Sequence, residues 1–149
     1  MMRRREFIAG LGSSAAALPL VAHAQQPGRM RRIAMLNGYD ENNPFFRGLA
    51  TDTFRALAQM GWEGGRNVQV FEYWSRGDIN RAEALAKEVV ALQPDVILAN
   101  STPVTAALKH ETATIPIVFA VVADPVGSGF VASLPHPGGN VTGFSSVEA

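Results

Sequence analysis

Three short apolar runs constrain the fold of this chain more than any other feature of its sequence. They are residues 31–37 (RRIAMLN), 95–99 (DVILA) and 117–122 (IVFAVV), and each is followed by a segment with cap residues and helical spacing. Continuous apolar runs of this length are typical of strands buried on both faces of a parallel sheet. Parallel neighbours need a long crossover, which is usually a helix. The pattern therefore predicts an α/β fold.

Two more strands and four helices complete the expected order. Strands are predicted at residues 67–74, at a sheet edge, and at residues 141–145. Helices are predicted after Asn43-Pro44, over residues 79–92 with an outward Glu83–Lys87 pair, over residues 101–111 with a hydroxyl cap, and over residues 124–134. Three of them open with a polar cap residue and a proline, both of which favour a helix start. We expect a doubly wound parallel sheet, Rossmann-like or flavodoxin-like, with right-handed crossovers.

The first 24 residues are predicted to be an export signal. An arginine run at residues 3–5 precedes a mildly apolar stretch to Val21 and the triplet Ala22-His23-Ala24. A basic start, a short apolar region and small residues at the end describe a cleavable leader rather than a membrane span. Residues 4–8 (RREFI) resemble a twin-arginine motif, and a general secretory leader is the alternative. Either route predicts the periplasm of a Gram-negative bacterium, with residues 25–149 as the mature chain.

The composition of the expected mature chain excludes several classes of function. Residues 25–149 carry 10 basic and 12 acidic side chains, a net charge of −2, and the whole chain has no cysteine. Nucleic-acid binding needs clustered Lys and Arg, so no nucleic-acid partner is expected. Disulfides, thiolate nucleophiles and cysteine metal sites are ruled out. No later apolar run reaches spanning length, so no membrane insertion is expected after signal cleavage.

Polar residues follow the predicted strands, where ligands bind in open parallel sheets. Residues 37–41 are polar and stand at the end of the first predicted strand. Ser101 and Thr102 follow residues 95–99 at a predicted helix start, where free backbone N–H groups favour a ligand carboxylate. The candidate ligand-binding residues are Tyr39, Asp40, Asn100, Ser101, Thr102 and Asp124. For Ser101, Thr102 and Asp124 the alternative role is helix capping, and for Tyr39 it is covering the end of the sheet.

No catalytic, metal or cofactor motif is found. The three histidines lack metal-ligand spacing, and no serine lies in a G-x-S-x-G elbow. Ser101, Asp124 and His136 are the one grouping from which an exported hydrolase could be built. The glycine pairs do not match a nucleotide-binding loop. We therefore expect a non-enzyme without cofactors, with a small-molecule ligand.

The stretch from Pro94 to Ser146 resembles the tryptophan/tyrosine-binding type of ABC transporter substrate-binding protein. Its most specific motifs are residues 115–118 (IPIV), residues 124–127 (DPVG) and residues 137–143 (PGGNVTG). The leader and residues 60–68 (MGWEGGRNV) agree, so the resemblance covers essentially the whole chain.

The resemblance implies a type I periplasmic binding protein fold, in which two lobes close on a small molecule, possibly an amino acid, and deliver it to ABC permease subunits. Residues 25–149 would then be the first lobe, with the second lobe absent from this sequence. Ligand contacts are implied near Tyr39, Ser101, Thr102 and Asp124. The alternative is an extracytoplasmic ligand-sensing domain that signals to a partner protein.

Overall fold

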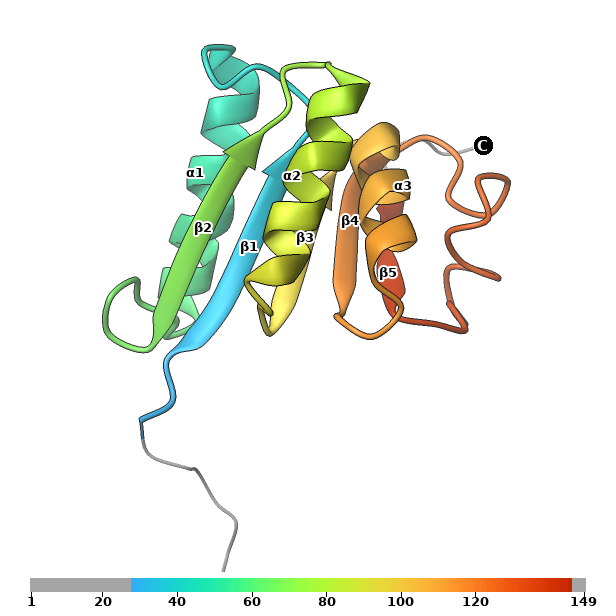
Figure 1. The fold of residues 1–149 in the computed structure, drawn as a ribbon. Coiled ribbons are helices and arrows are strands. Elements are labelled where there is room, and N and C mark those ends of the chain that lie inside the picture. Colours follow the sequence, from blue (N-terminus) through green and yellow to red (C-terminus); the bar gives the residue numbers. More distant parts are fainter. Residues whose placement is uncertain (1–27, 146–149) are drawn as a thin grey trace, which may run out of the picture.

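The structure is a computed structural model that describes residues 28–145 as one parallel sheet with helices on both faces (Figure 1). The strands are β1 (Arg31–Asn37), β2 (Val68–Trp74), β3 (Val96–Asn100), β4 (Ile117–Val122) and β5 (Val141–Ser145). The helices are α1 (Pro44–Gln59), α2 (Ile79–Ala91) and α3 (Thr102–Glu111). The predicted α/β class is confirmed. The predicted leader, residues 1–24, lies outside the described residues.

The five strands run in the order β2-β1-β3-β4-β5, and every neighbouring pair is parallel. This is the flavodoxin-like order, and β2 lies at an edge as expected. The chain places β2 on one side of β1 and then β3, β4 and β5 on its other side, so the direction in which strands are added reverses between β1 and β3. The helix after β1 covers one face of the sheet, whereas α2 and α3 cover the other (Figure 1). A crevice is therefore expected at the carboxyl ends of β1 and β3.

Each face of the sheet has its own apolar core. On one face Ala86 and Val89 of α2 and Leu108 of α3 are fully buried against the strands. On the other face Ala50 of α1 packs with Met35 and other residues of the sheet. Burial of one large aliphatic side chain contributes about 1.5–3 kcal/mol, so the larger cluster under α2 and α3 supplies most of the stabilisation.

Polar side chains cap the starts of α1 and α2, and the sequence predicted the first of these caps, Asn43. The Asn43 side chain accepts a hydrogen bond from the Phe45 N–H at 3.0 Å, and the Asp78 side chain accepts one from the Arg81 N–H at 3.0 Å. Gly61, with φ of +91°, follows the last turn of α1 in the left-handed conformation that glycine favours. These contacts satisfy backbone groups that a helix end would otherwise leave unpaired.

The helix predicted over residues 124–134 is wrong. This segment forms one hydrogen-bonded turn over residues 125–129 and then an irregular loop to β5. Asp124 accepts a hydrogen bond from the Gly127 N–H at 2.7 Å, as a cap would, but Gly129 adopts φ of +69° two residues later. A left-handed glycine ends a helix, so the segment stops after one turn.

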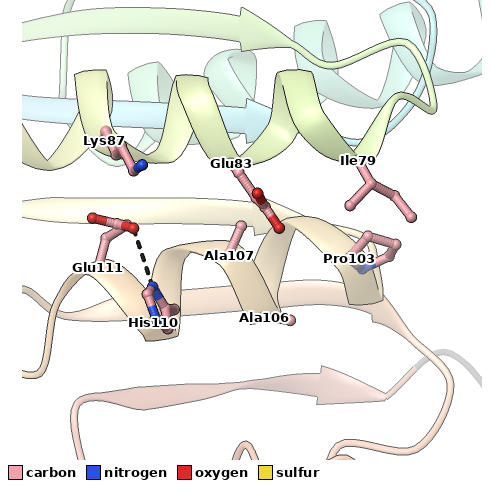
Figure 2. A pocket seen from close by; sticks show the side chains of 8 residues that line it. All are labelled: Ile79, Glu83, Lys87, Pro103, Ala106, Ala107, His110 and Glu111. Atoms are coloured by element: carbon pink, nitrogen blue, oxygen red, sulfur yellow. Dashed lines mark hydrogen bonds and ion pairs between the residues drawn. The ribbon is translucent and has the colours of Figure 1, made fainter.

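A groove of about 440 Å³ separates α2 and α3 on their outer side (Figure 2). Small and apolar side chains, among them Pro103 and Ala107, line it together with four titratable residues. The predicted Glu83–Lys87 ion pair does not form within the described chain, since no contact joins the two side chains. The one contact drawn there joins His110 Nδ1 and Glu111 Oε1, which lie 3.1 Å apart. None of the predicted ligand-binding residues lines this groove.

Replacement of Gly143 tests the pairing of β4 with β5. A Cβ atom at this position would lie 2.2 Å from the Phe119 carbonyl oxygen and 2.6 Å from its Cγ. Because Phe119 is fully buried, it has no room to yield. We expect Gly143→Ala to lower the free energy of unfolding, measured in urea, by about 1–3 kcal/mol or more, the range for overpacked cores.

Gly64→Ala is the matched control, because a Cβ at Gly64 would meet nothing within 4 Å and its φ is not positive. Its stability should stay within about 0.5 kcal/mol of the wild type. Equal stability of the two variants would show that β5 does not lie against Phe119 as described.

Candidate functional site

A shallow depression of about 490 Å³ lies at the carboxyl edge of the sheet, where the strand order reverses. Four strand ends contribute to it. The lining residues are Gly38, Tyr39, Gly77, Ser101, Thr102, Pro103, Val121 and Ala123. The structure thus brings together three of the six predicted ligand-binding residues: Tyr39, Ser101 and Thr102.

Backbone hydrogen bonds hold the loop after β1 to its neighbours. The Gly38 N–H donates to the Asn100 carbonyl at 2.9 Å, and the Gly77 N–H donates to the Gly38 carbonyl at 2.8 Å. The Arg76 N–H donates to the Tyr39 carbonyl at 3.3 Å. The loop is therefore fixed from both sides, by β3 and by the turn after β2.

Tyr39 presents an aromatic surface at one side of the depression. Its ring stacks on Phe46 of α1, with centroids 3.5 Å apart and planes 3° from parallel. Phe45 packs edge-on against Phe46. The two rings lie face to face, so Phe46 of α1 covers one face of the Tyr39 ring. A ligand that stacked on Tyr39 would use the ring face opposite Phe46.

Ser101 differs most from its expected role as a capping hydroxyl. It stands at the N-cap of α3, but its side chain makes no capping hydrogen bond. Its Oγ is buried and has no partner among the described residues. Without a base in contact, this hydroxyl lacks the partner that a Ser101–His136–Asp124 hydrolase would require.

The backbone of Ser101 explains why the hydroxyl does not cap. Its φ of +116° and ψ of 157° lie in a region almost restricted to glycine, which costs about 1–3 kcal/mol. This conformation turns the side chain toward Gly38, where an added Cβ would lie 2.1 Å from Ser101 Oγ. Gly38 and Ser101 thus require each other: the glycine has no side chain because the serine fills that space.

The other three candidates lie outside the depression. Asp124 follows the lining residue Ala123, and its carboxylate accepts from the Gly127 N–H. Asp40 is exposed and accepts hydrogen bonds from the backbone and side chain of Asn42. Asn100 lines a hollow of about 280 Å³ on the α1 face of the sheet. Contact between these residues and a ligand remains a prediction.

Asn100 pairs with a second buried asparagine. Its Nδ2 donates to Asn37 Oδ1 at 3.2 Å, while Asn37 Nδ2 and Asn100 Oδ1 have no partner among the described residues. Both side chains end neighbouring strands, since Asn37 and Asn100 are aligned in the β1–β3 register. In the sequence, Asn37 is the last residue of the apolar run 31–37 and Asn100 directly follows the run 95–99.

Glu41 and Arg76 form an ion pair across the same loop. Arg76 Nε donates to Glu41 Oε2 at 2.9 Å, and a second bond joins Arg76 Nη2 to Glu41 Oε1. These hydrogen bonds are the main cause that lowers the pKa of Glu41 from 4.5 to about 2. The pair ties the loop that carries Tyr39 to the turn after β2. Sequence reasoning placed Glu41 in this loop but did not find its partner.

Two negative findings hold for residues 28–145. No group of three or more His, Asp or Glu side chains in that range could hold a metal ion. In the same range, no helix has the length and hydropathy needed to cross a membrane.

Comparisons with known proteins identify the family. The family model for ABC transporter substrate binding proteins matches residues 49–149, more than half of the chain. A tyrosine-binding protein of Clostridioides difficile (strain R20291) is 37% identical over 91 residues, which are 61% of this chain and 26% of that protein. The chain therefore belongs to the ABC transporter substrate-binding protein family, as the motifs predicted.

Solved structures agree with this assignment. The ligand-free, open structure of a substrate binding protein with adhesive properties from Clostridium difficile has a TM-score of 0.75 and 28% identity, and covers 80% of this chain and 40% of that one. A structure from Streptococcus pneumonia, described as the ABC domain in complex with L-Trp, has a TM-score of 0.72 and 28% identity, and covers 78% of this chain and 39% of that one.

The relatives also indicate the class of protein and the compartment in which the family is found. The proteins from Clostridioides difficile and Clostridium difficile are both named as binding proteins, and proteins of this family are extracellular or periplasmic. The α/β fold of this chain resembles one lobe of the type I periplasmic binding proteins. The chain spans about a quarter of the curated relative's length and about 40% of the two solved structures.

Substitution of Ser101 by glycine tests the strained backbone. Ser101→Gly removes the unfavourable φ and an unpaired buried hydroxyl, although glycine costs up to about 1 kcal/mol of backbone entropy. We expect the free energy of unfolding of Ser101→Gly, measured in urea, to equal or exceed that of the wild type. Ser75→Gly is the control, because Ser75 is also buried but has no positive φ, and it should lose about 1 kcal/mol. Equal losses in both variants would exclude strain at Ser101.

The Glu41–Arg76 pair predicts a specific acid dependence. Because the folded-state pKa of Glu41 is lowered to about 2, the stabilisation is fully present above pH 4.5 and is lost as the pH falls through about 2. In Glu41→Gln, thermal unfolding midpoints should fall less between pH 4.5 and pH 2 than in the wild type. Asp95, whose pKa is lowered mainly by the Arg32 N–H, contributes equally in both proteins.

Arg76→Gln should show the same shallow acid dependence, because it removes the same ion pair. Added salt should weaken the wild-type effect, since both side chains are partly exposed. Parallel pH curves for the wild type and Glu41→Gln would contradict the assigned pairing.

Proposed function

We propose that this chain is part of the solute-binding component of an ABC importer, that it binds an amino acid, and that it delivers the ligand to permease subunits. The observation that carries this is the depression at the strand-order reversal, where Tyr39, Ser101 and Thr102 meet at the start of α3. The relatives support it, because one is named for tyrosine binding and another was solved with L-Trp.

The chemistry of the depression suits an amino-acid zwitterion. The N-terminus of α3, at Thr102, carries the positive end of the helix dipole, which favours a ligand carboxylate. Asp124, next to the lining residue Ala123, supplies a negative charge for the ammonium group. Tyr39 supplies an aromatic surface for the side chain. In this proposal none of these groups performs catalysis, and the predicted export leader delivers the protein to the periplasm.

We expect the ligand to bind weakly to residues 25–149 alone. A small ligand is held tightly when most of its surface is buried, and an open depression supplies only one wall. Titration of ¹⁵N-labelled protein with L-tryptophan should shift the amides of residues 38–39 and 101–102, with a Kd of about 1 mM or weaker. Absence of any shift would refute the proposed function. Micromolar binding would refute the single-wall account.

Asp124→Asn separates charge from structure. The Asn side chain still has an oxygen that accepts from the Gly127 N–H, so stability should be almost unchanged. Loss of the charge should weaken L-tryptophan binding about three- to tenfold. Indole-3-propionate, which lacks the ammonium group, is the matched control and should bind both proteins equally. Equal L-tryptophan binding by both proteins would remove Asp124 from the site.

A further inference from the structure

The strand β4 contains an irregularity at the end that faces the depression. Its pairing with β5 shifts register between Phe119 and Val122. Within this interval Val121 adopts φ of +55°. A β-branched residue rarely takes this left-handed conformation, and an extra residue in one strand is a β-bulge, which redirects the side chains beside it.

The bulge removes Val121 from the apolar core. Ile117 and Phe119 are fully buried in the cluster under α2 and α3, and strict alternation would place Val121 beside them. Instead Val122 is fully buried in that cluster, and Val121 is half-buried and lines the depression. One aliphatic side chain has thus been transferred from the core to the wall of the site.

Strained backbone is concentrated around this depression. Within residues 28–145, four residues other than glycine have positive φ: Arg76, Gln93, Ser101 and Val121. Two of them line the depression and Arg76 directly precedes the lining residue Gly77. Strained residues persist where the surrounding structure enforces them, and they cluster at ligand sites.

We propose that Val121 is a specificity-determining residue, whose strained backbone holds an aliphatic side chain against the apolar part of the ligand. This rests on the proposed function. Thr102 at the start of α3 forms the polar side of the depression, while Val121 and Tyr39 add apolar surface. A site with this division selects amino acids with large apolar or aromatic side chains over small ones.

Val121→Gly tests the strain and the specificity together. Glycine adopts a φ of +55° freely, so the thermal unfolding midpoint should stay level or rise. Val118→Gly is the matched control in the same strand, because Val118 is half-buried, has no positive φ and lines the other face. It should lower the midpoint. Equal losses in the two variants would overturn strain at Val121.

Binding is measured by NMR titration of each protein with L-tryptophan and with L-alanine, from the initial slopes of the amide shifts. Val121→Gly should weaken L-tryptophan binding at least about threefold and leave L-alanine unchanged. Val121→Ala, which keeps the backbone constraint on a shorter side chain, should change binding in the same direction.

The outcomes separate the two proposals. A normal wild-type response with unchanged L-tryptophan binding in both Val121 variants would overturn the role of Val121 alone. So would an equal loss for both ligands. If the wild type responds to neither amino acid, the proposed function fails and the specificity role fails with it.

Discussion

The close approach of Gly38 to Ser101 is the constraint on which the carboxyl edge of this sheet depends. The Gly38 N–H donates to the Asn100 carbonyl at 2.9 Å, which extends the β1–β3 pairing one residue beyond the strands. Any Cβ on Gly38 would overlap the Ser101 side chain. Because this contact fixes where the loop after β1 and the start of α3 lie, it also positions Tyr39 and Thr102 at the depression.

The rest of the lobe compensates for the strain stored at this edge. Two residues in glycine-type conformations, Ser101 and Val121, cost about 1–3 kcal/mol each, a large part of the 5–15 kcal/mol by which a typical domain is stable. The cluster under α2 and α3 contains Leu108 and other fully buried aliphatic residues, each contributing about 1.5–3 kcal/mol. The fold therefore tolerates strained residues where they shape the depression.

The sequence predicted the architecture of the lobe well and its site only in part. Apolar runs and cap residues identified the five strands and three helices that the structure describes, because hydrophobic period and helix termini are local signals. The helix predicted after Asp124 is wrong, because the left-handed Gly129 ends this segment after one turn. The conformations of Ser101 and Val121 could not be predicted, since neither residue type signals positive φ. Both depend on contacts with distant segments, which a pattern along the chain does not contain.

The weak binding that we propose for residues 25–149 alone is consistent with the proposed transport function. A carrier must release its ligand, so its affinity must come from contacts that can be separated again. In this proposal, the depression supplies a helix N-terminus, an aromatic ring and one aliphatic side chain, which would orient a ligand without enclosing it. In the proposed importer, closure of a second wall would supply the remaining buried area, and reopening would return the ligand to the weak affinity of this surface. If Tyr39 and Val121 contact the ligand as proposed, their rigid placement favours binding, because little ordering of side chains is required when the ligand arrives.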